Sequence, residues 1–187
     1  MLTLTSRHRH SRTAAMLRTA FLIALPYFTV GCSEDEHHGP APAISLDAAL
    51  IEGNDHAVRD HIIAGTPVNT PNAAGDTPLS VAAVLGRTYA AEVLIDAGAE
   101  LEHRNNSGTT PLFNAAFFCH PEIVRVLIDA GADTGTTDAS GTPIRQVMEV
   151  PWEQIEPIYA AVYGAIGIPL DASRIQSMRP QIAAMLR

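Results

Sequence analysis

The chain of 187 residues contains no lysine and only two cysteines, Cys32 and Cys119. Two cysteines cannot form a framework of several disulfide bridges, and the sequence has no CxxC motif or cysteine–histidine cluster typical of zinc sites. Its basic residues are 12 arginines, against 20 acidic residues. Four arginines and no acidic residue precede Cys32, so residues 32–187 hold 8 arginines against 20 acids, a formal charge of −12. Because so acidic a surface repels phosphate groups, we expect no nucleic-acid partner.

The sequence also lacks the motifs that accompany common catalytic sites. It contains no nucleophile elbow, phosphate-binding loop, metal-binding helix motif or recognised pair of carboxylates. We therefore expect neither an enzyme nor a bound cofactor or metal ion. Cys119 and its neighbour His120 could serve a redox protein or a thiol nucleophile, but no second acid or base is placed to orient His120. This favours a half-buried, unreactive thiol.

No apolar stretch reaches the roughly 20 residues that a transmembrane helix requires. The longest, residues 20–30, follows Arg18 and is interrupted by Pro26. A positive charge before a short apolar run is typical of a secretory signal peptide. Translation starts at Met1 or at Met16, since either is followed by such a signal.

The end of this run, "TVGC" at residues 29–32, resembles the lipobox of bacterial lipoproteins. The resemblance implies that residues 1–31 are a lipoprotein signal peptide, removed after Cys32 receives a diacylglycerol, and that the new amino terminus is acylated. Thr29, where leucine is usual, departs from the pattern. Ser33 resembles lipoproteins sent to the outer membrane, so the expected location is the periplasmic face of that membrane. The alternative is a secreted protein, cut nearby, with Cys32 free.

Residues 32–43 are predicted to form the acylated cysteine and a flexible tether. The segment "SEDEHHGPAPA" combines charge, glycine and proline without an apolar period, so it cannot bury a core. His37 and His38 with the acids before them could hold a divalent metal, but adjacent residues on a flexible segment have poor ligand geometry. A solvated spacer is therefore the prediction.

A 33-residue repeat organises the rest of the chain. The unit "GDTPLSVAAVLGRTYAAEVLIDAGAELEHRN" from Gly75 is followed by "GTTPLFNAAFFCHPEIVRVLIDAGADTGTTD" from Gly108. Their TPL turns, Ala-Ala pairs and glycine-rich endings resemble ankyrin repeats. The resemblance implies an all-α ankyrin-repeat solenoid over residues 44–187, built from about four helix-turn-helix units with hairpin loops, including degenerate caps.

Physical chemistry agrees with this pattern. A threonine followed by proline is expected to begin the first helix of each unit, at Thr77 and Thr110. Small residues at 82–83 and 115–116 allow helices of neighbouring units to approach closely. The second helices are expected to end on glycines in the left-handed conformation, namely Gly65, Gly98 and Gly131.

Cys119 stands where the two preceding units have Gly53 and Gly86. A non-glycine residue in a left-handed turn costs about 1 kcal/mol or more. Either the turn relaxes locally, or the thiol has a role.

The terminal units depart from the repeat. In the first, His61 replaces the leucines of the next units, as expected for an N-terminal cap with one side facing water. Residues 142–187 are predicted to form a C-terminal cap. Pro151 and Pro157 are expected to break its helical pattern and leave a second helix at residues 158–163. A closing helix is expected to start at the cap residue Ser173 and to be interrupted by Pro180.

The resemblance places partner contacts on the hairpin tips and on the exposed face of each first helix. By register, the tip residues are Ala73, Ala74, Asp76, Asn106, Ser107 and Thr109. The helix residues are Val84, Leu85, Phe117 and Phe118. With Ile51 at the matching place in the first unit, the helix residues form either an exposed apolar strip rimmed by acids, or a strip with one residue of each pair tucked inward.

Ankyrin-repeat proteins commonly act as binding surfaces for other proteins. The resemblance therefore implies a monomeric, lipid-anchored adaptor or inhibitor that holds a protein of unknown identity in its concave groove. Two versions remain open: immunity against a toxin delivered into the periplasm, and an accessory role in periplasmic oxidative-stress defence. The alternative from another class is a redox protein that uses Cys119.

Overall fold

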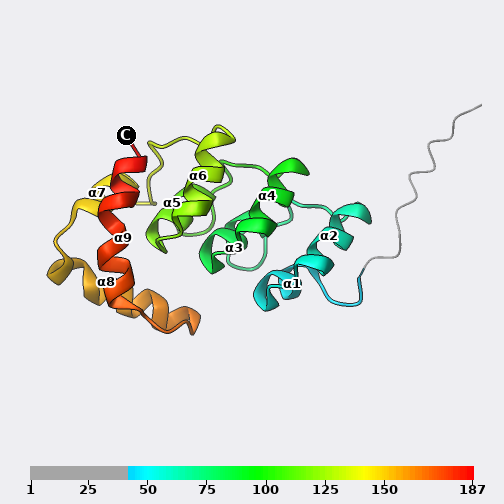
Figure 1. The fold of residues 1–187 in the computed structure, drawn as a ribbon, viewed down its shortest axis with the longest axis horizontal. Helices are drawn as coiled ribbons and strands as arrows, with labels where there is room; N and C mark the ends of the chain where they lie inside the picture. Colours follow the sequence, from blue (N-terminus) through cyan, green and yellow to red (C-terminus); the bar gives the residue numbers. More distant parts are fainter. Residues whose placement is uncertain (1–41) are drawn as a thin grey trace, which may run out of the picture. The chain divides into compact units, whose positions relative to one another are not determined.

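The computed structural model describes residues 42–187 (Figure 1). This part of the chain forms nine α-helices, and its extended backbone is limited to an isolated bridge between Thr137 and Pro143. The helices are α1 (Leu46–Glu52), α2 (Asp55–Ile63), α3 (Pro78–Leu85), α4 (Thr88–Asp96), α5 (Pro111–Phe117), α6 (Pro121–Asp129), α7 (Ile144–Glu149), α8 (Trp152–Ile166) and α9 (Ala172–Met185).

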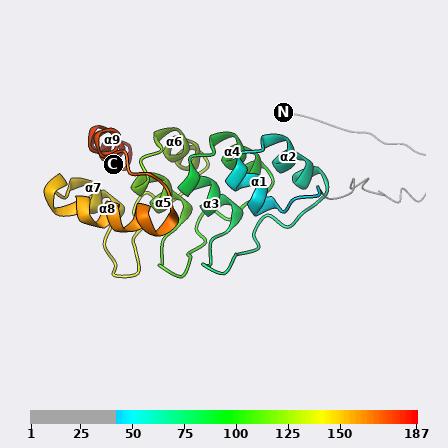
Figure 2. The same ribbon diagram turned by 90° about the horizontal axis from the view of Figure 1, so that it is seen from below.

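The helices form two rows. The inner helices α1, α3, α5 and α7 contact one another in sequence, and so do the outer helices α2, α4, α6 and α9 (Figure 2). Hairpin loops join each outer helix to the next inner one and extend beyond the inner row (Figure 2). The predicted all-α stack of about four helix-turn-helix units is confirmed, with α8 inserted between the two helices of the last unit.

Two predictions lie outside the described residues: the signal peptide at residues 1–31, and Cys32 with most of the tether. Within residues 42–187, none of the helices combines the length and the apolar content needed to cross a bilayer.

The local signals for helix ends are confirmed. The hydroxyls of Thr77 and Thr110 accept hydrogen bonds from the amides of Ser80 and Phe113, which lack partners within a helix. The outer helices α2, α4 and α6 are followed by glycines at positive φ: 70° at Gly65, 84° at Gly98 and 98° at Gly131.

One continuous core runs through the stack. The alanine pairs at 82–83 and 115–116 have no exposed surface, because α3 and α5 approach closely there. Leu94 and Leu127 of the outer helices are also fully buried, and Ile175 and Ile182 of α9 continue the core into the last unit. A single unit has too little apolar surface on its own, so stability comes from stacking.

Each unit also supplies hydrogen-bond donors to the unit before it. Arg87 donates through Nε to the carbonyl of Leu50 at 3.0 Å and through Nη2 to that of Ile51 at 2.8 Å. His120 Nε2 donates to the carbonyl of Val84 at 3.1 Å. The last carbonyls of a helix have no partner within it, so these contacts cap α1 and α3 and tie adjacent units together.

The donor at the end of α5, the third inner helix, comes from α9 and not from the position that corresponds to His120. The residue 33 positions after His120 is Glu153, whose side chain carries no N–H donor. Instead Arg174 of α9 donates through Nη1 to the carbonyl of Cys119 at 2.9 Å and through Nη2 to that of Phe118 at 3.3 Å.

These caps explain where glycine is required. Gly53 and Gly86 both have φ near +71°, and a Cβ there would lie 2.6 Å from Arg87 Nη1 and 2.7 Å from His120 Cε1, respectively. Cys119 keeps the same left-handed conformation, with φ +55°, so its turn does not relax.

The helix α8 corrects the prediction for residues 151–163. It runs from Trp152 to Ile166 without a break at Pro157. Proline removes one N–H, which leaves the carbonyl of Glu153 without its helical partner. Both residues are exposed, so water can satisfy that carbonyl.

The closing helix also differs from its prediction. Asp171, rather than Ser173, caps α9: its carboxylate accepts a hydrogen bond from the amide of Arg174 at 3.0 Å. The helix continues through Pro180, which lies on the exposed side. Of the two helices after α7, it is α9 that packs against α7 as the second helix of the last unit.

His61 was expected on a water-facing side of the first unit, but it is only 4% exposed. Its Nε2 lies 2.8 Å from the carbonyl of Ile44 and its Nδ1 lies 3.0 Å from Thr66 Oγ1. The segment before α1 therefore covers this histidine and satisfies both ring nitrogens.

Two glycine substitutions distinguish the left-handed strain of these turns from the lack of space for a Cβ beside a capping side chain. Gly98→Ala places a Cβ at φ +84° in open space, so it should cost only the left-handed strain, about 1 kcal/mol. Gly86→Ala adds a clash with His120 and should cost about 2–3 kcal/mol, because the bond to Val84 is also lost. Urea denaturation measures both, and equal losses would contradict the capping role of His120.

Candidate functional site

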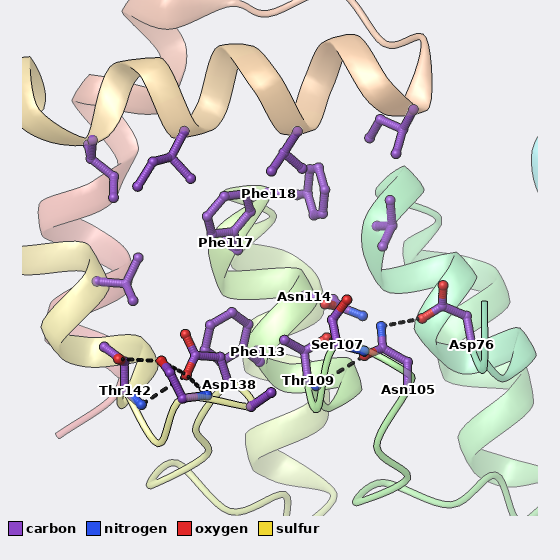
Figure 3. Close-up of a pocket in the computed structure, with 18 of the residues that line it drawn as sticks. Asp76, Asn105, Ser107, Thr109, Phe113, Asn114, Phe117, Phe118, Asp138 and Thr142 are labelled. Carbon is purple, nitrogen blue, oxygen red and sulfur yellow. Dashed lines mark hydrogen bonds between the residues drawn. The ribbon is translucent and has the colours of Figure 1, made fainter.

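The helix α8 lies across the end of α5 and extends toward α3 (Figure 3). Aromatic side chains hold it there. The rings of Phe117 and Tyr159 stack with centroids 4.5 Å apart, and those of Phe118 and Tyr163 lie 5.2 Å apart. Tyr159 and Tyr163, four residues apart, therefore form the face of α8 that packs onto the stack.

This packing decides between the two predictions for the apolar strip. Phe118 is only 6% exposed and Phe117 is half-buried, because α8 covers them. Val84 and Leu85 of α3 are also half-buried. Ile51 alone of the five predicted strip residues is well exposed, at 62%. A continuous, open apolar strip is thus absent from the inner helices.

Beside α8 lies a groove with a volume of about 730 Å³ (Figure 3). One wall is apolar and consists of Ile155, Ile158, Val162 and Ile166 of α8 with Phe117 and Phe118 of α5. The opposite wall is formed by the hairpin loops and includes Asp76, Asn105, Ser107, Thr109, Asp138 and Thr142. Phe113 and Asn114 of α5 lie between the two walls.

The hairpin wall repeats one local structure three times. Asn72, Asn105 and Asp138 are each 33 residues apart, and the side-chain oxygen of each accepts two backbone amides of its own turn. Such Asx turns fix the loop without a strand. Asn105 Nδ2 also donates to Asp76 Oδ1 at 2.7 Å, which joins adjacent hairpins.

Asp76 and Asp138 are the ionisable residues that line the groove. Hydrogen bonds from the Ser140 hydroxyl and from the amide of Thr142 lower the pKa of Asp138 below its ordinary value. The carboxylate is therefore ionised at neutral pH, and the hairpin side of the groove is acidic.

Six of the ten predicted contact residues line this groove: Asp76, Val84, Ser107, Thr109, Phe117 and Phe118. Thr109 is only 8% exposed, and its hydroxyl donates to Asn105 Oδ1, so it stabilises the hairpin instead of projecting from its tip.

The other four lie elsewhere. Ala73, Ala74 and Asn106 are exposed at the hairpin tips, where Asn106 donates through its backbone amide to Ala74 and through Nδ2 to Ala73. Leu85 lies beside a smaller hollow lined by His120 and Arg174.

Sequence reasoning missed the apolar wall supplied by α8. Its groove-facing residues Ile158, Val162 and Ile166 are spaced by four, as expected for one stripe of a helix. The signal was present, but the helix predicted at residues 158–163 ended before Ile166, whereas α8 extends to that residue. Asn114 was missed because no motif distinguishes it. The third hairpin at residues 138–142 was also missed, although Asp138 follows Asn72 and Asn105 at the 33-residue spacing of the repeat.

The structure contradicts a redox or nucleophilic role for Cys119. The residue has no exposed surface, and burial raises the pKa of its thiol to about 11. A reactive cysteine needs the thiolate and access to solvent. His120 does not act as its base, since Nε2 is bonded to Val84. Nor is the thiol half-buried as expected: the residue is fully buried, and its Sγ faces the carbonyl of Ile175 of α9.

A family model described as ankyrin repeats matches residues 46–138 in three copies. The chain contains three ankyrin repeats. They correspond to the helix pairs α1–α2, α3–α4 and α5–α6 with their hairpins, and the predicted ankyrin-repeat solenoid is confirmed. Ankyrin repeats are protein-interaction modules and imply a protein partner. A search of curated proteins found no match to the chain.

His120 should also make the free energy of unfolding depend on pH. Burial, opposed by the bond to Val84, lowers the pKa of His120 below its ordinary 6.5. Between pH 6.5 and that lower value the unfolded chain binds more protons than the folded chain, so the free energy of unfolding should fall as the pH falls. His120→Gln should make this slope shallower in urea titrations at pH 5 to 7. Equal slopes for both proteins would contradict the assignment.

Proposed function

We propose that the chain is an envelope lipoprotein whose ankyrin repeats hold a protein partner in the groove between α8 and the hairpins. It acts as an adaptor or as an inhibitor of that partner. The groove is larger than a crevice left by imperfect packing, and it is bounded by two walls of different chemistry.

The exposed apolar face of α8 carries this proposal. Ile158 is 50% exposed and Ile166 is 43% exposed, and both line the groove. Large apolar side chains gathered on a concave surface are characteristic of contact sites for other proteins. The packing face of the same helix is already used by Tyr159 and Tyr163, so this second stripe is not needed to hold α8 in place.

The polar groups of the groove support a binding role. Asp76 and Asp138 both accept hydrogen bonds from neighbouring hairpin groups, and these bonds organise the loops. No histidine, cysteine or arginine accompanies them along the groove walls that the structure describes. Binding, rather than bond cleavage, is the activity that these groups support.

Site-specific photo-cross-linking in living cells tests the groove as a contact site. A photoreactive phenylalanine analogue at Ile158 should yield a discrete cross-linked protein. The same analogue at Ile63, which is 58% exposed on α2, is the matched control and should not. Mass spectrometry identifies the product. Identical products from both positions, or none from Ile158, would contradict the proposal.

The proposed envelope location rests on the lipobox-like residues 29–32. Several acyl chains at Cys32 would give stable membrane attachment, since each buried CH₂ contributes about 0.8 kcal/mol. Radiolabelled palmitate should enter the protein and be lost in Cys32→Ser, whereas Cys119→Ser should keep the label. A chain that takes up no palmitate, or that remains cytosolic on fractionation, would refute this part of the proposal.

A further inference from the structure

Asn114 is a buried amide whose donor has no acceptor. Its Nδ2 makes no hydrogen bond with any group in residues 42–187, although the residue is only 6% exposed. It lies on the side of α5 that faces the groove (Figure 3). The preceding repeat has Val81 at this position, so packing of the repeats does not require an amide. Buried amides nearly always have a partner, and a molecule bound in the groove that Asn114 lines would supply the missing acceptor.

The charges of the groove all have one sign. Asp76 and Asp138 each use Oδ1 to accept hydrogen bonds within the hairpins, and Oδ2 of each takes none from residues 42–187. Among residues 42–187, no basic side chain lines the groove to neutralise them. Asp76 and Asp138 lie toward opposite ends of the groove, with Ser107 and Thr109 between them (Figure 3). A cationic group of the bound molecule at either position would therefore meet a carboxylate with free lone pairs.

The wall opposite these carboxylates is apolar. Ile158, Val162 and Ile166 present one stripe of α8 along the groove, next to Phe117. A molecule that fills the groove must therefore be apolar on one side and cationic on the other. It must also bring a hydrogen-bond acceptor to Asn114, between the two.

We propose that the groove binds an extended, cationic segment of the partner polypeptide: apolar side chains lie against Ile158 and Val162, a main-chain carbonyl accepts from Asn114, and one arginine or lysine lies at Asp76 and another at Asp138. This rests on the proposed function and specifies its partner. An extended backbone fits best, because the carbonyls of a helical segment are already paired within the helix. A second copy of this acidic chain, with a net charge of −8, lacks the complementary charge.

Peptide selection tests the chemistry directly. The full chain in lipid nanodiscs is exposed to a displayed library of random 12-residue peptides, and the strongest peptides are synthesised and titrated. We expect them to pair large apolar residues with arginine or lysine, and to bind more weakly as salt is raised. Asp76→Asn with Asp138→Asn should weaken binding about tenfold. The control pair Glu92→Gln with Asp129→Asn removes the same charge from exposed positions of the outer helices and should change affinity less than twofold.

A third variant, Asn114→Val, introduces the residue that the preceding repeat has at Val81. We expect it to keep the fold, with a melting temperature at least equal to that of the native chain. It should weaken the same peptides severalfold, because the carbonyl loses its donor.

Acidic or uncharged selected peptides, equal affinities for the two charge pairs, or failure to select any peptide would overturn the inference. So would a dimer that Ile158→Ser converts to a monomer in sedimentation, since a second copy would then fill the groove. After any of the three peptide results, cross-linking from Ile158 to a protein would still support the proposed function. Failure of this inference can therefore be distinguished from failure of the proposed function.

Discussion

The carbonyl groups at the ends of the inner helices α1, α3 and α5 determine how the units of this protein are joined. A side chain from the unit that follows donates a hydrogen bond at each of these ends: Arg87 for α1, His120 for α3 and Arg174 for α5. Each donor passes close to the turn that ends the helix. Two of those turns therefore have no room for a Cβ and contain glycine. The third donor comes from α9, and Cys119 is accommodated with its thiol buried and protonated.

The same constraint shapes the end of the stack. In the last unit, α9 both packs as the outer helix and supplies the capping arginine, so α8 has no position in the two rows. It lies instead on the aromatic end of α5 through Tyr159 and Tyr163. This placement covers Phe118, which is only 6% exposed, and gives the stack a wall that the three matched repeats do not contain.

The resulting groove combines two surfaces of different origin. Its acidic side consists of hairpins whose Asx turns recur every 33 residues, and it is therefore a property of the repeats. Its apolar side belongs to the inserted helix, and Asn114 lies between them without a partner for its donor. An asymmetric groove of this kind restricts both the chemistry and the orientation of a bound segment, which a uniformly apolar surface would not do.

Sequence alone determined the features that depend on nearby residues: the 33-residue unit, the threonine caps at Thr77 and Thr110, and the left-handed glycines that end the outer helices. Each depends on contacts within a few residues, so the local pattern suffices. Tertiary structure decided the course of α8 through Pro157, the burial of Phe118 and the acceptor-free amide of Asn114. These depend on which carbonyls face water and on which surfaces a distant helix covers, and no local pattern contains that information.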